Sequence, residues 1–237
     1  DEMALTLWST LQQFISRRRP VAGCITRDAL IRALRNLFEL ADFPDHLADW
    51  QRLQQLSNTS IAQVRDVIGE QIRLPRNIEI DMLEKALRES AGAVLLGSSG
   101  VGKSVTAKRF AEQRMAAGER CLWFDARSFE RTDWAAFESD LGIAHSLEDM
   151  FGNAPDARPL LVLDGLDRLF DDAVFSIVAT LLRCLHSEEQ DAPWHIVVTC
   201  QISEWPRLQA SLSKAGVLTN SWKSIECEPA KLSDFEL

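Results

Sequence analysis

A run of eight residues, Gly97-Ser-Ser-Gly-Val-Gly-Lys-Ser104, constrains this chain more than any other feature, because it matches the pattern G-x-x-x-x-G-K-[ST]. The apolar run Ala93–Leu96 comes directly before it, and a helical pattern begins near Lys103. The sequence therefore predicts a buried strand, a glycine-rich turn and a helix in that order. In this context the pattern forms a phosphate-binding loop, or P-loop.

The residue types of the loop suit a bound polyphosphate. Glycines let the backbone curl close to phosphates, and amides at the start of the helix point toward the anion. We expect the Lys103 ammonium to contact the β- and γ-phosphates and the Ser104 hydroxyl to bind Mg²⁺. Because no Asn-Lys-x-Asp element is present, we expect ATP or ADP rather than GTP. The expected nucleotide-binding residues of this segment are Gly97, Ser98, Ser99, Gly100, Val101, Gly102, Lys103, Ser104 and Val105.

Two carboxylates follow a second apolar run. Leu160–Asp164 reads as a buried strand that ends in Asp164, which places this carboxylate beside the P-loop as a magnesium ligand. Gly165 permits a sharp turn, so Asp167 can face the γ-phosphate and polarise the attacking water. The alternative, in which Asp167 is a helix cap or a surface residue, stays open. Lys103 and Asp167 are the expected catalytic residues.

A third polar strand end follows the apolar run Ile196–Val198. Thr199 and Gln201 lie there and are candidates to sense the γ-phosphate, although an ordinary strand end is an equally open interpretation. His195, just before this run, is interpreted as the first residue of a strand rather than as a catalyst.

Short apolar runs without polar alternation, separated by helical patterns, predict an α/β fold with a parallel sheet covered by helices on both faces. About five strands are expected, and the runs that indicate them are Ala93–Leu96, Cys121–Phe124, Leu160–Leu163, Ile196–Val198 and, more weakly, Trp222–Cys227. Residues 76–237 are predicted to form this P-loop nucleotide-binding domain. Residues 1–75 contain only helical stripes, such as Leu30–Phe38, and are predicted to be a helical N-terminal region or linker.

Composition and charge disfavour several classes of site and partner. The formal net charge of −9 disfavours binding to nucleic acid. The five cysteines, of which Cys24 is the first, contain no C-x-x-C pair, so neither a zinc site nor a redox motif is indicated, and a reducing cytoplasm is expected. No apolar run approaches the roughly 18 residues that a membrane span needs.

Because the chain opens at Asp1 rather than Met, we expect it to be a piece of a longer protein.

At this point the sequence resembles a known family. Gly97–Ser104, the Asp164-Gly-Leu-Asp167 form of the Walker B motif and the strand end Thr199-Cys-Gln201 are similar to the STAND class of P-loop ATPases, which includes the NACHT and apoptotic-ATPase groups. The resemblance covers roughly Ile80–Leu237. It implies that the strand with Ile196–Val198 lies between the two Walker strands, which are Ala93–Leu96 before the P-loop (Walker A) and Leu160–Leu163 before Asp164 (Walker B).

The same resemblance implies a function. Members of the class are ATP-dependent switches with an effector domain and sensor repeats elsewhere in the chain, and many bacterial members act in signalling or antiviral defence. A nucleotide-dependent homo-oligomer is therefore an expected partner, together with those effector and sensor domains.

Two positions depart from the class. Arg168 stands where NACHT members usually carry a second acidic residue, and Gln201 stands where many members have a sensor arginine. We expect a slow ATPase, and a nucleotide-binding module that never hydrolyses stays open. A motor-type ATPase that remodels protein or nucleic acid and a small-molecule kinase stay open as well. The acidic balance disfavours action on nucleic acid, and the absence of an arginine-rich phosphate lid disfavours the kinase.

Overall fold

The computed structural model describes residues 2–18, 30, 33–34, 37–38, 46–67, 76–152, 158–169, 171–185 and 194–229. The chain divides into two compact units, Asp1–His46 and Leu47–Leu237. In the first unit the structure describes the helix α1 (Glu2–Arg18). Cys24 lies outside the described residues, as do residues 31–32 and 35–36 of the helical stripe predicted over Leu30–Phe38.

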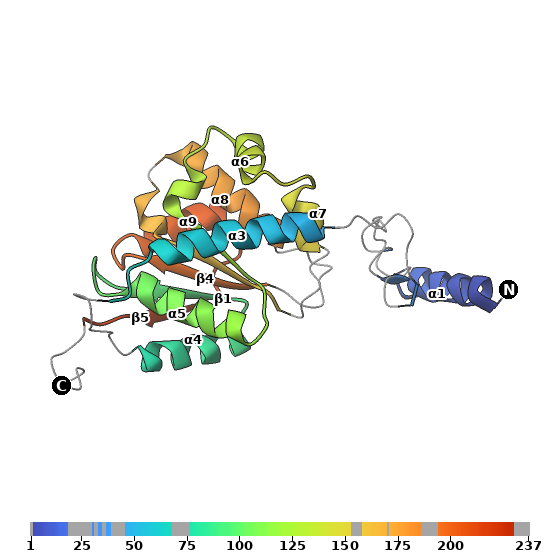
Figure 1. The fold of residues 1–237 in the computed structure, drawn as a ribbon, viewed down its shortest axis with the longest axis horizontal. Helices are drawn as coiled ribbons and strands as arrows, with labels where there is room; N and C mark the ends of the chain where they lie inside the picture. Colours follow the sequence, from blue (N-terminus) through green and yellow to red (C-terminus); the bar gives the residue numbers. More distant parts are fainter. Residues whose placement is uncertain are drawn as a thin grey trace. The chain divides into compact units, whose positions relative to one another are not determined.

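The second unit contains a five-stranded parallel sheet in the order β2-β3-β4-β1-β5 (Figure 1). This confirms the predicted α/β fold and its number of strands. It also confirms that the strand with Ile196–Val198 lies between the two Walker strands. The strands are β1 (Gly92–Leu96), β2 (Cys121–Asp125), β3 (Leu160–Asp164), β4 (His195–Cys200) and β5 (Lys223–Glu226).

The strand sequences lack polar alternation because both faces of the sheet are covered. Every residue of β1 and of β4 is buried. Alternate residues point to opposite faces, so Val94 and Leu96 enter one hydrophobic cluster, and Ala93 and Leu95 enter the other. Apart from His195 and Thr199 of β4, these two strands therefore lack polar side chains, as expected for a doubly covered parallel sheet.

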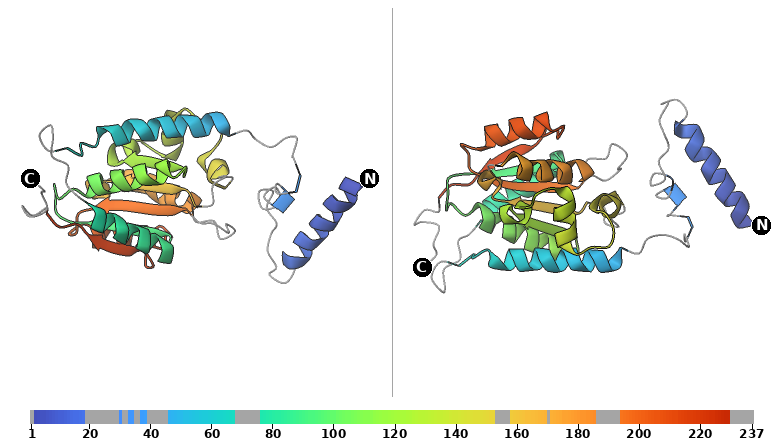
Figure 2. Two further views of the ribbon diagram at one scale, coloured as in Figure 1. Left: turned by 60° about the horizontal axis from the view of Figure 1, so that its bottom comes forward. Right: turned by 90° about the horizontal axis from the view of Figure 1, so that it is seen from above.

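The helices divide between the two faces in the same way (Figures 1 and 2). One face is covered by α4 (Asn77–Glu89) and by α5 (Lys103–Ala116), which follows the P-loop. The other face is covered by α6 (Trp134–Leu141), α7 (Leu147–Gly152), α8 (Asp172–Leu185) and α9 (Trp205–Lys214). Short 3₁₀ turns, η2 (Ala126–Phe129) and η3 (Leu166–Arg168), follow β2 and β3 at their carboxyl ends.

The helix α3 (Leu47–Gln63) belongs to this unit, although the sequence placed the domain boundary between residues 75 and 76. It packs along β2, the strand at the edge of the sheet, where the Trp123 amide donates a hydrogen bond to Ser57 Oγ (3.0 Å). Trp50 and Leu53 of α3 join one hydrophobic cluster, and Ile61 joins the other. The compact unit therefore begins at Leu47, because α3 completes the core on both sides of the sheet edge. Residues 68–75 lie outside the described part.

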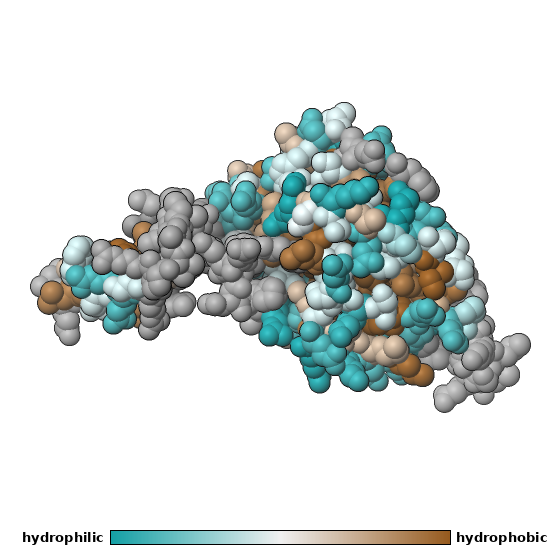
Figure 3. Space-filling model, turned by 180° about the vertical axis from the view of Figure 1, so that it is seen from behind, coloured by the Kyte–Doolittle hydropathy of each residue, from teal (hydrophilic) through white to brown (hydrophobic). Residues whose placement is uncertain are grey.

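Among the residues that the structure describes, no helix combines the length and the apolar character needed to cross a bilayer. On the face of the second unit seen in Figure 3, hydrophobic surface occurs in separate patches with hydrophilic residues between them.

Candidate functional site

The loop between β1 and α5 has the strand–turn–helix context that its sequence predicts, since β1 ends at Leu96 and α5 begins at Lys103. Gly102 adopts a φ of 98°, and a Cβ there would lie 2.8 Å from a guanidinium nitrogen of Arg76. At Gly97 a Cβ would lie 2.7 Å from the Cys227 carbonyl oxygen, at the end of β5. Glycine is therefore required at both positions by close approach of other groups, and at Gly102 also by the backbone conformation.

A buried arginine fastens the loop to its surroundings. The Arg76 side chain donates to the carbonyl oxygens of Val101 and of Glu228 (3.0 Å for the latter), and it pairs with Glu79 at 2.7 Å. The residue is only 3% exposed. These contacts join the start of α4, the P-loop and the end of β5. Sequence analysis missed this role, because a single arginine before a helix carries no motif.

Lys103 and Ser104, at the start of α5, make different contacts. The Lys103 ammonium donates to the carbonyl oxygens of Gly97 (3.0 Å) and Ser98 (2.8 Å), so it lies against its own loop. The Ser104 hydroxyl donates to Asp164 Oδ1 at 2.7 Å. The structure thus brings together the two predicted magnesium ligands. A hydroxyl and a carboxylate are hard oxygen donors of the kind Mg²⁺ prefers, so the residues present fit this ion.

Thr199 holds the Asp164 carboxylate in place. Its hydroxyl donates to Asp164 Oδ1 (2.6 Å) and accepts a hydrogen bond from the Gly165 amide (2.8 Å). The side chain is 1% exposed, and both of its contacts are within the protein. The geometry therefore favours a role in orienting Asp164, whereas the sequence made Thr199 a candidate for direct contact with nucleotide.

Gln201 pairs with Asp167 in a similar way. The Gln201 amide nitrogens, backbone and side chain, donate to the two carboxylate oxygens of Asp167 at 3.2 and 3.0 Å. Asp167 is 8% exposed and lies in the 3₁₀ turn η3, directly after Gly165 with its φ of 75°. The sharp turn predicted after β3 is thus present, but the sequence did not indicate that Gln201 would engage this carboxylate.

These groups surround a cavity of about 470 Å³ at the carboxyl ends of the strands. Nine predicted site residues line it: Ser99, Gly100, Gly102, Lys103, Ser104, Val105, Asp167, Thr199 and Gln201. Asp164 lines an adjoining hollow of about 200 Å³ that shares Val64, Ser104 and Arg168 with the larger cavity. The lining of neither includes Gly97, Ser98 or Val101, which lie within the loop itself. Val64 and Arg65, which follow α3, line the larger cavity, and the sequence gave no sign of this.

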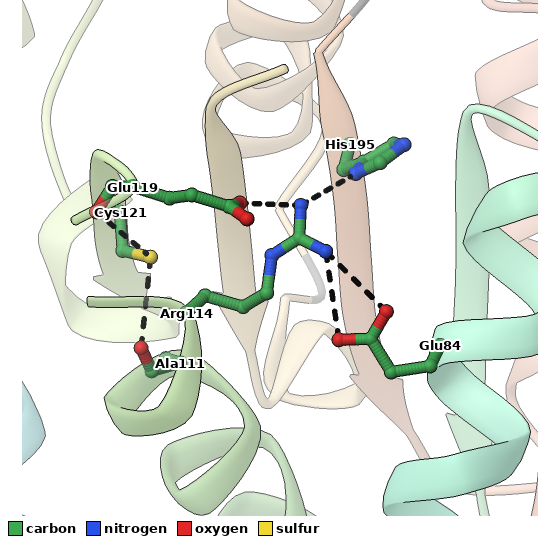
Figure 4. Close-up of polar contacts among 6 residues, drawn as sticks. All are labelled: Glu84, Ala111, Arg114, Glu119, Cys121 and His195. Atoms are coloured by element: carbon green, nitrogen blue, oxygen red, sulfur yellow. Dashed lines mark hydrogen bonds and ion pairs between the residues drawn. The ribbon is translucent and has the colours of Figure 1, made fainter. Parts of the chain in front are cut away.

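A second polar cluster lies at the opposite end of the sheet, around the first residue of β4 (Figure 4). Arg114 of α5 contacts His195 Nδ1 (3.1 Å), Glu84 (3.4 Å) and Glu119 (2.5 Å). Burial, together with the positive charges of Arg114 and Arg158, lowers the pKa of His195 to about 4. The imidazole is therefore neutral and accepts a hydrogen bond from the guanidinium. His195 begins its strand as predicted and links it to α5.

The described cysteines do not form disulfide bonds, and three of them have weakly acidic thiols. Burial raises the pKa of Cys200 to about 12 and that of Cys184 and of Cys227 to about 11. A thiol in this state is a poor nucleophile and a poor metal ligand at neutral pH.

No protein-family model matches the chain, and neither does any curated protein. Among solved structures, AMPPCP-bound DnaA from Aquifex aeolicus matches 68% of this chain at 16% identity, with a TM-score of 0.44. A Walker-type ATPase of Pyrococcus abyssi matches 73% of the chain at 16% identity and a TM-score of 0.48. The DnaC helicase loader matches 74% at 15% identity and a TM-score of 0.47. The chain spans 48% of the DnaA chain and 59% of the Pyrococcus ATPase. At these identities the similarity concerns the fold alone.

Proposed function

We propose that this chain is a magnesium-dependent ATP-binding domain that hydrolyses ATP slowly. The observation that carries the proposal is the hydrogen bond of 2.7 Å between Ser104 of the P-loop helix and Asp164 at the end of β3. It joins the hydroxyl and the carboxylate that a nucleotide-bound Mg²⁺ would need, at the mouth of a glycine-rich loop.

Each group then has a defined role. The loop amides and the Lys103 ammonium hold the β- and γ-phosphates, and Ser104 and Asp164 hold the magnesium ion, whose charge offsets that of the phosphates. Thr199 keeps the Asp164 carboxylate oriented. Asp167 accepts the proton of the attacking water, because its carboxylate lies on the wall of the same cavity.

A module that binds nucleotide without hydrolysis is the second candidate, and one observation favours it. Both oxygens of Asp167 accept hydrogen bonds from Gln201, so an attacking water would have to compete with Gln201 for this carboxylate. In the hydrolysing form of the proposal, Asp167 exchanges the Gln201 side-chain amide for water when nucleotide is bound. The two candidates therefore differ in turnover and agree on binding.

The wider role in the proposal rests on the resemblance to STAND ATPases. In that role the ATP and ADP forms of the domain differ and control effector and sensor domains of a longer cytoplasmic protein, in signalling or antiviral defence. ATP-dependent self-assembly would belong to the same switch.

The magnesium assignment is tested with Asp164→Asn. The amide oxygen of Asn can still accept hydrogen bonds from Ser104 and Thr199, so the fold is retained while the charge that attracts the ion is lost. In calorimetric titration with AMPPCP, the parent should bind at least about 10-fold more tightly with Mg²⁺ than with EDTA, and the variant should lose most of this difference. Asp81→Asn, which changes an exposed carboxylate of α4, is the matched control. An undiminished magnesium effect in Asp164→Asn would contradict the assignment.

A further inference from the structure

The end of α3 reaches the nucleotide cavity because the helix is fixed along the edge of the sheet. Ser57 of α3 is 1% exposed and accepts a hydrogen bond from the Trp123 amide of β2. Where α3 ends, Gln63 accepts a hydrogen bond from the Arg127 guanidinium (2.9 Å), in the turn that follows β2. Figures 1 and 2 show α3 running beside the sheet in each view. The residues that follow Gln63 therefore lie at the carboxyl ends of the strands.

The P-loop helix itself holds this segment. Lys108 of α5 is 8% exposed, and its ammonium donates to the Val64 carbonyl oxygen (2.8 Å) and to Asp66 Oδ1 (3.4 Å). Lys108 lies four residues after Ser104, so the two side chains share one face of α5. The face of the helix that presents the proposed magnesium ligand thus also anchors the residues on both sides of Arg65.

Arg65 stands between these two anchored residues and lines the cavity with Lys103 and Arg168. The only acidic side chain that lines the same cavity, among the residues that the structure describes, is Asp167. The guanidinium groups of Arg65 and Arg168 make no ion pair with any described residue. The lining of this cavity therefore carries more positive than negative side chains, which suits a polyphosphate.

The position of residues 64–66 indicates which phosphate of the polyphosphate Arg65 would contact. Val64, next to Arg65, borders both the main cavity and the smaller hollow that contains Ser104 and Asp164. Arg168 borders both spaces as well. These two residues thus lie on the side of the proposed metal ligands, where the outermost phosphate of a triphosphate would be bound.

We infer that Arg65, supplied by the segment after α3 of the same chain, binds the terminal phosphate of a nucleoside triphosphate and, with Arg168, makes the site prefer triphosphate over diphosphate. This inference rests on the proposed nucleotide-binding function and adds a specificity-determining residue to it. A guanidinium suits this role because its planar donors match phosphate oxygens in pairs.

The test is Arg65→Gln, which removes the charge of an exposed side chain. Calorimetric titrations of the whole chain with AMPPCP and with ADP, both with Mg²⁺, give the two affinities. We expect Arg65→Gln to bind AMPPCP at least about 10-fold more weakly than the parent while its ADP affinity changes less than about twofold. Arg65→Lys should retain part of the AMPPCP affinity, because it keeps the charge but not the paired donors. Arg88→Gln, an exposed α4 residue beside the distant His195 cluster, is the matched control.

The outcomes separate this inference from the proposed function. If the parent binds both nucleotides and Arg65→Gln weakens neither, or weakens both equally, the role of Arg65 is wrong and the P-loop assignment stands. If the parent binds neither nucleotide, both the proposed function and the role of Arg65 are wrong. Thermal unfolding of each variant without nucleotide should match that of the parent, since the Arg65 side chain is exposed.

Discussion

At the scale of single residues, the end of β4 orients both carboxylates of the candidate site. Thr199 donates to Asp164, and Gln201 donates to Asp167, which lies three residues after Asp164. This follows from the strand order, because β4 lies directly between the strand before the P-loop and the strand that ends in Asp164. Thr199 and Gln201 at the end of β4 therefore lie close to the end of β3 and the turn after it. There their side chains donate hydrogen bonds to the carboxylates of Asp164 and Asp167.

The role of Asp167 is tested by Asp167→Asn. The Asn amide can keep both hydrogen bonds to Gln201, because its oxygen accepts from the Gln201 backbone amide and its nitrogen can donate to a rotated Gln201 side chain. We expect AMPPCP affinity to change less than about threefold and single-turnover ATP hydrolysis to fall by about 10²-fold or more, since a general base typically contributes roughly 10²–10⁴-fold. Parental hydrolysis in this variant would make Asp167 a turn residue. No measurable hydrolysis by the parent would favour the binding module.

At the scale of the elements, β4 is fixed at its other end by a different set of groups. Its first residue, His195, accepts a hydrogen bond from Arg114 of α5, which also pairs with Glu84 of α4 and with Glu119 (Figure 4). This cluster connects both helices of one face to the central strand between the Walker strands. Because the pKa of His195 is lowered to about 4 by burial and by the charges of Arg114 and Arg158, the folded state requires the neutral imidazole.

A dependence of stability on pH follows. The unfolded chain binds a proton at His195 near pH 6.5, whereas the folded chain does so only near pH 4. The contribution of the neutral His195 to the free energy of unfolding is therefore complete above pH 6.5 and is lost as the pH falls toward 4. His195→Gln keeps an acceptor for Arg114 but does not titrate. Between about pH 7 and pH 5 the parent should lose about 2 kcal/mol more unfolding free energy than this variant. Urea unfolding at the two pH values measures the difference, and equal losses would contradict a neutral, buried His195.

At the scale of the whole molecule, the sequence predicted what depends on local pattern and failed where distant segments meet. The five apolar runs, the P-loop before Lys103 and the turn at Gly165 follow from neighbouring residues, and the structure contains each of them. The start of the compact unit at Leu47 does not, because a helical stripe such as that of α3 does not indicate which surface it covers. Arg76 and Arg65 reach the loop and the cavity only through tertiary packing. Helical patterns were expected between the strands, but the positions of the short helices α6, α7 and α9 were not predicted.

The net charge of the chain differs in sign from the charge that lines the larger cavity. The chain carries a formal net charge of −9, yet the larger cavity of its candidate site is lined by Arg65, Lys103 and Arg168 and, among the described residues, by the single carboxylate of Asp167, while Asp164 lines the adjoining hollow. The overall charge disfavours long nucleic acids, which contact a wide surface. A small polyphosphate responds to the local field of the cavity, so an acidic protein can still bind it.

The measurement that tests the central claim most directly is calorimetric titration of the parent and of Lys103→Ala with AMPPCP and Mg²⁺. The Lys103 ammonium contacts loop carbonyl oxygens rather than the hydrophobic core, so its removal should leave the thermal unfolding temperature nearly unchanged. Lys85→Ala, which removes an exposed ammonium from α4, is the matched control. The account predicts saturable binding by the parent and by Lys85→Ala, and affinity at least about 10-fold lower in Lys103→Ala. Equal affinity in Lys103→Ala and the parent, or no binding by the parent, would contradict it.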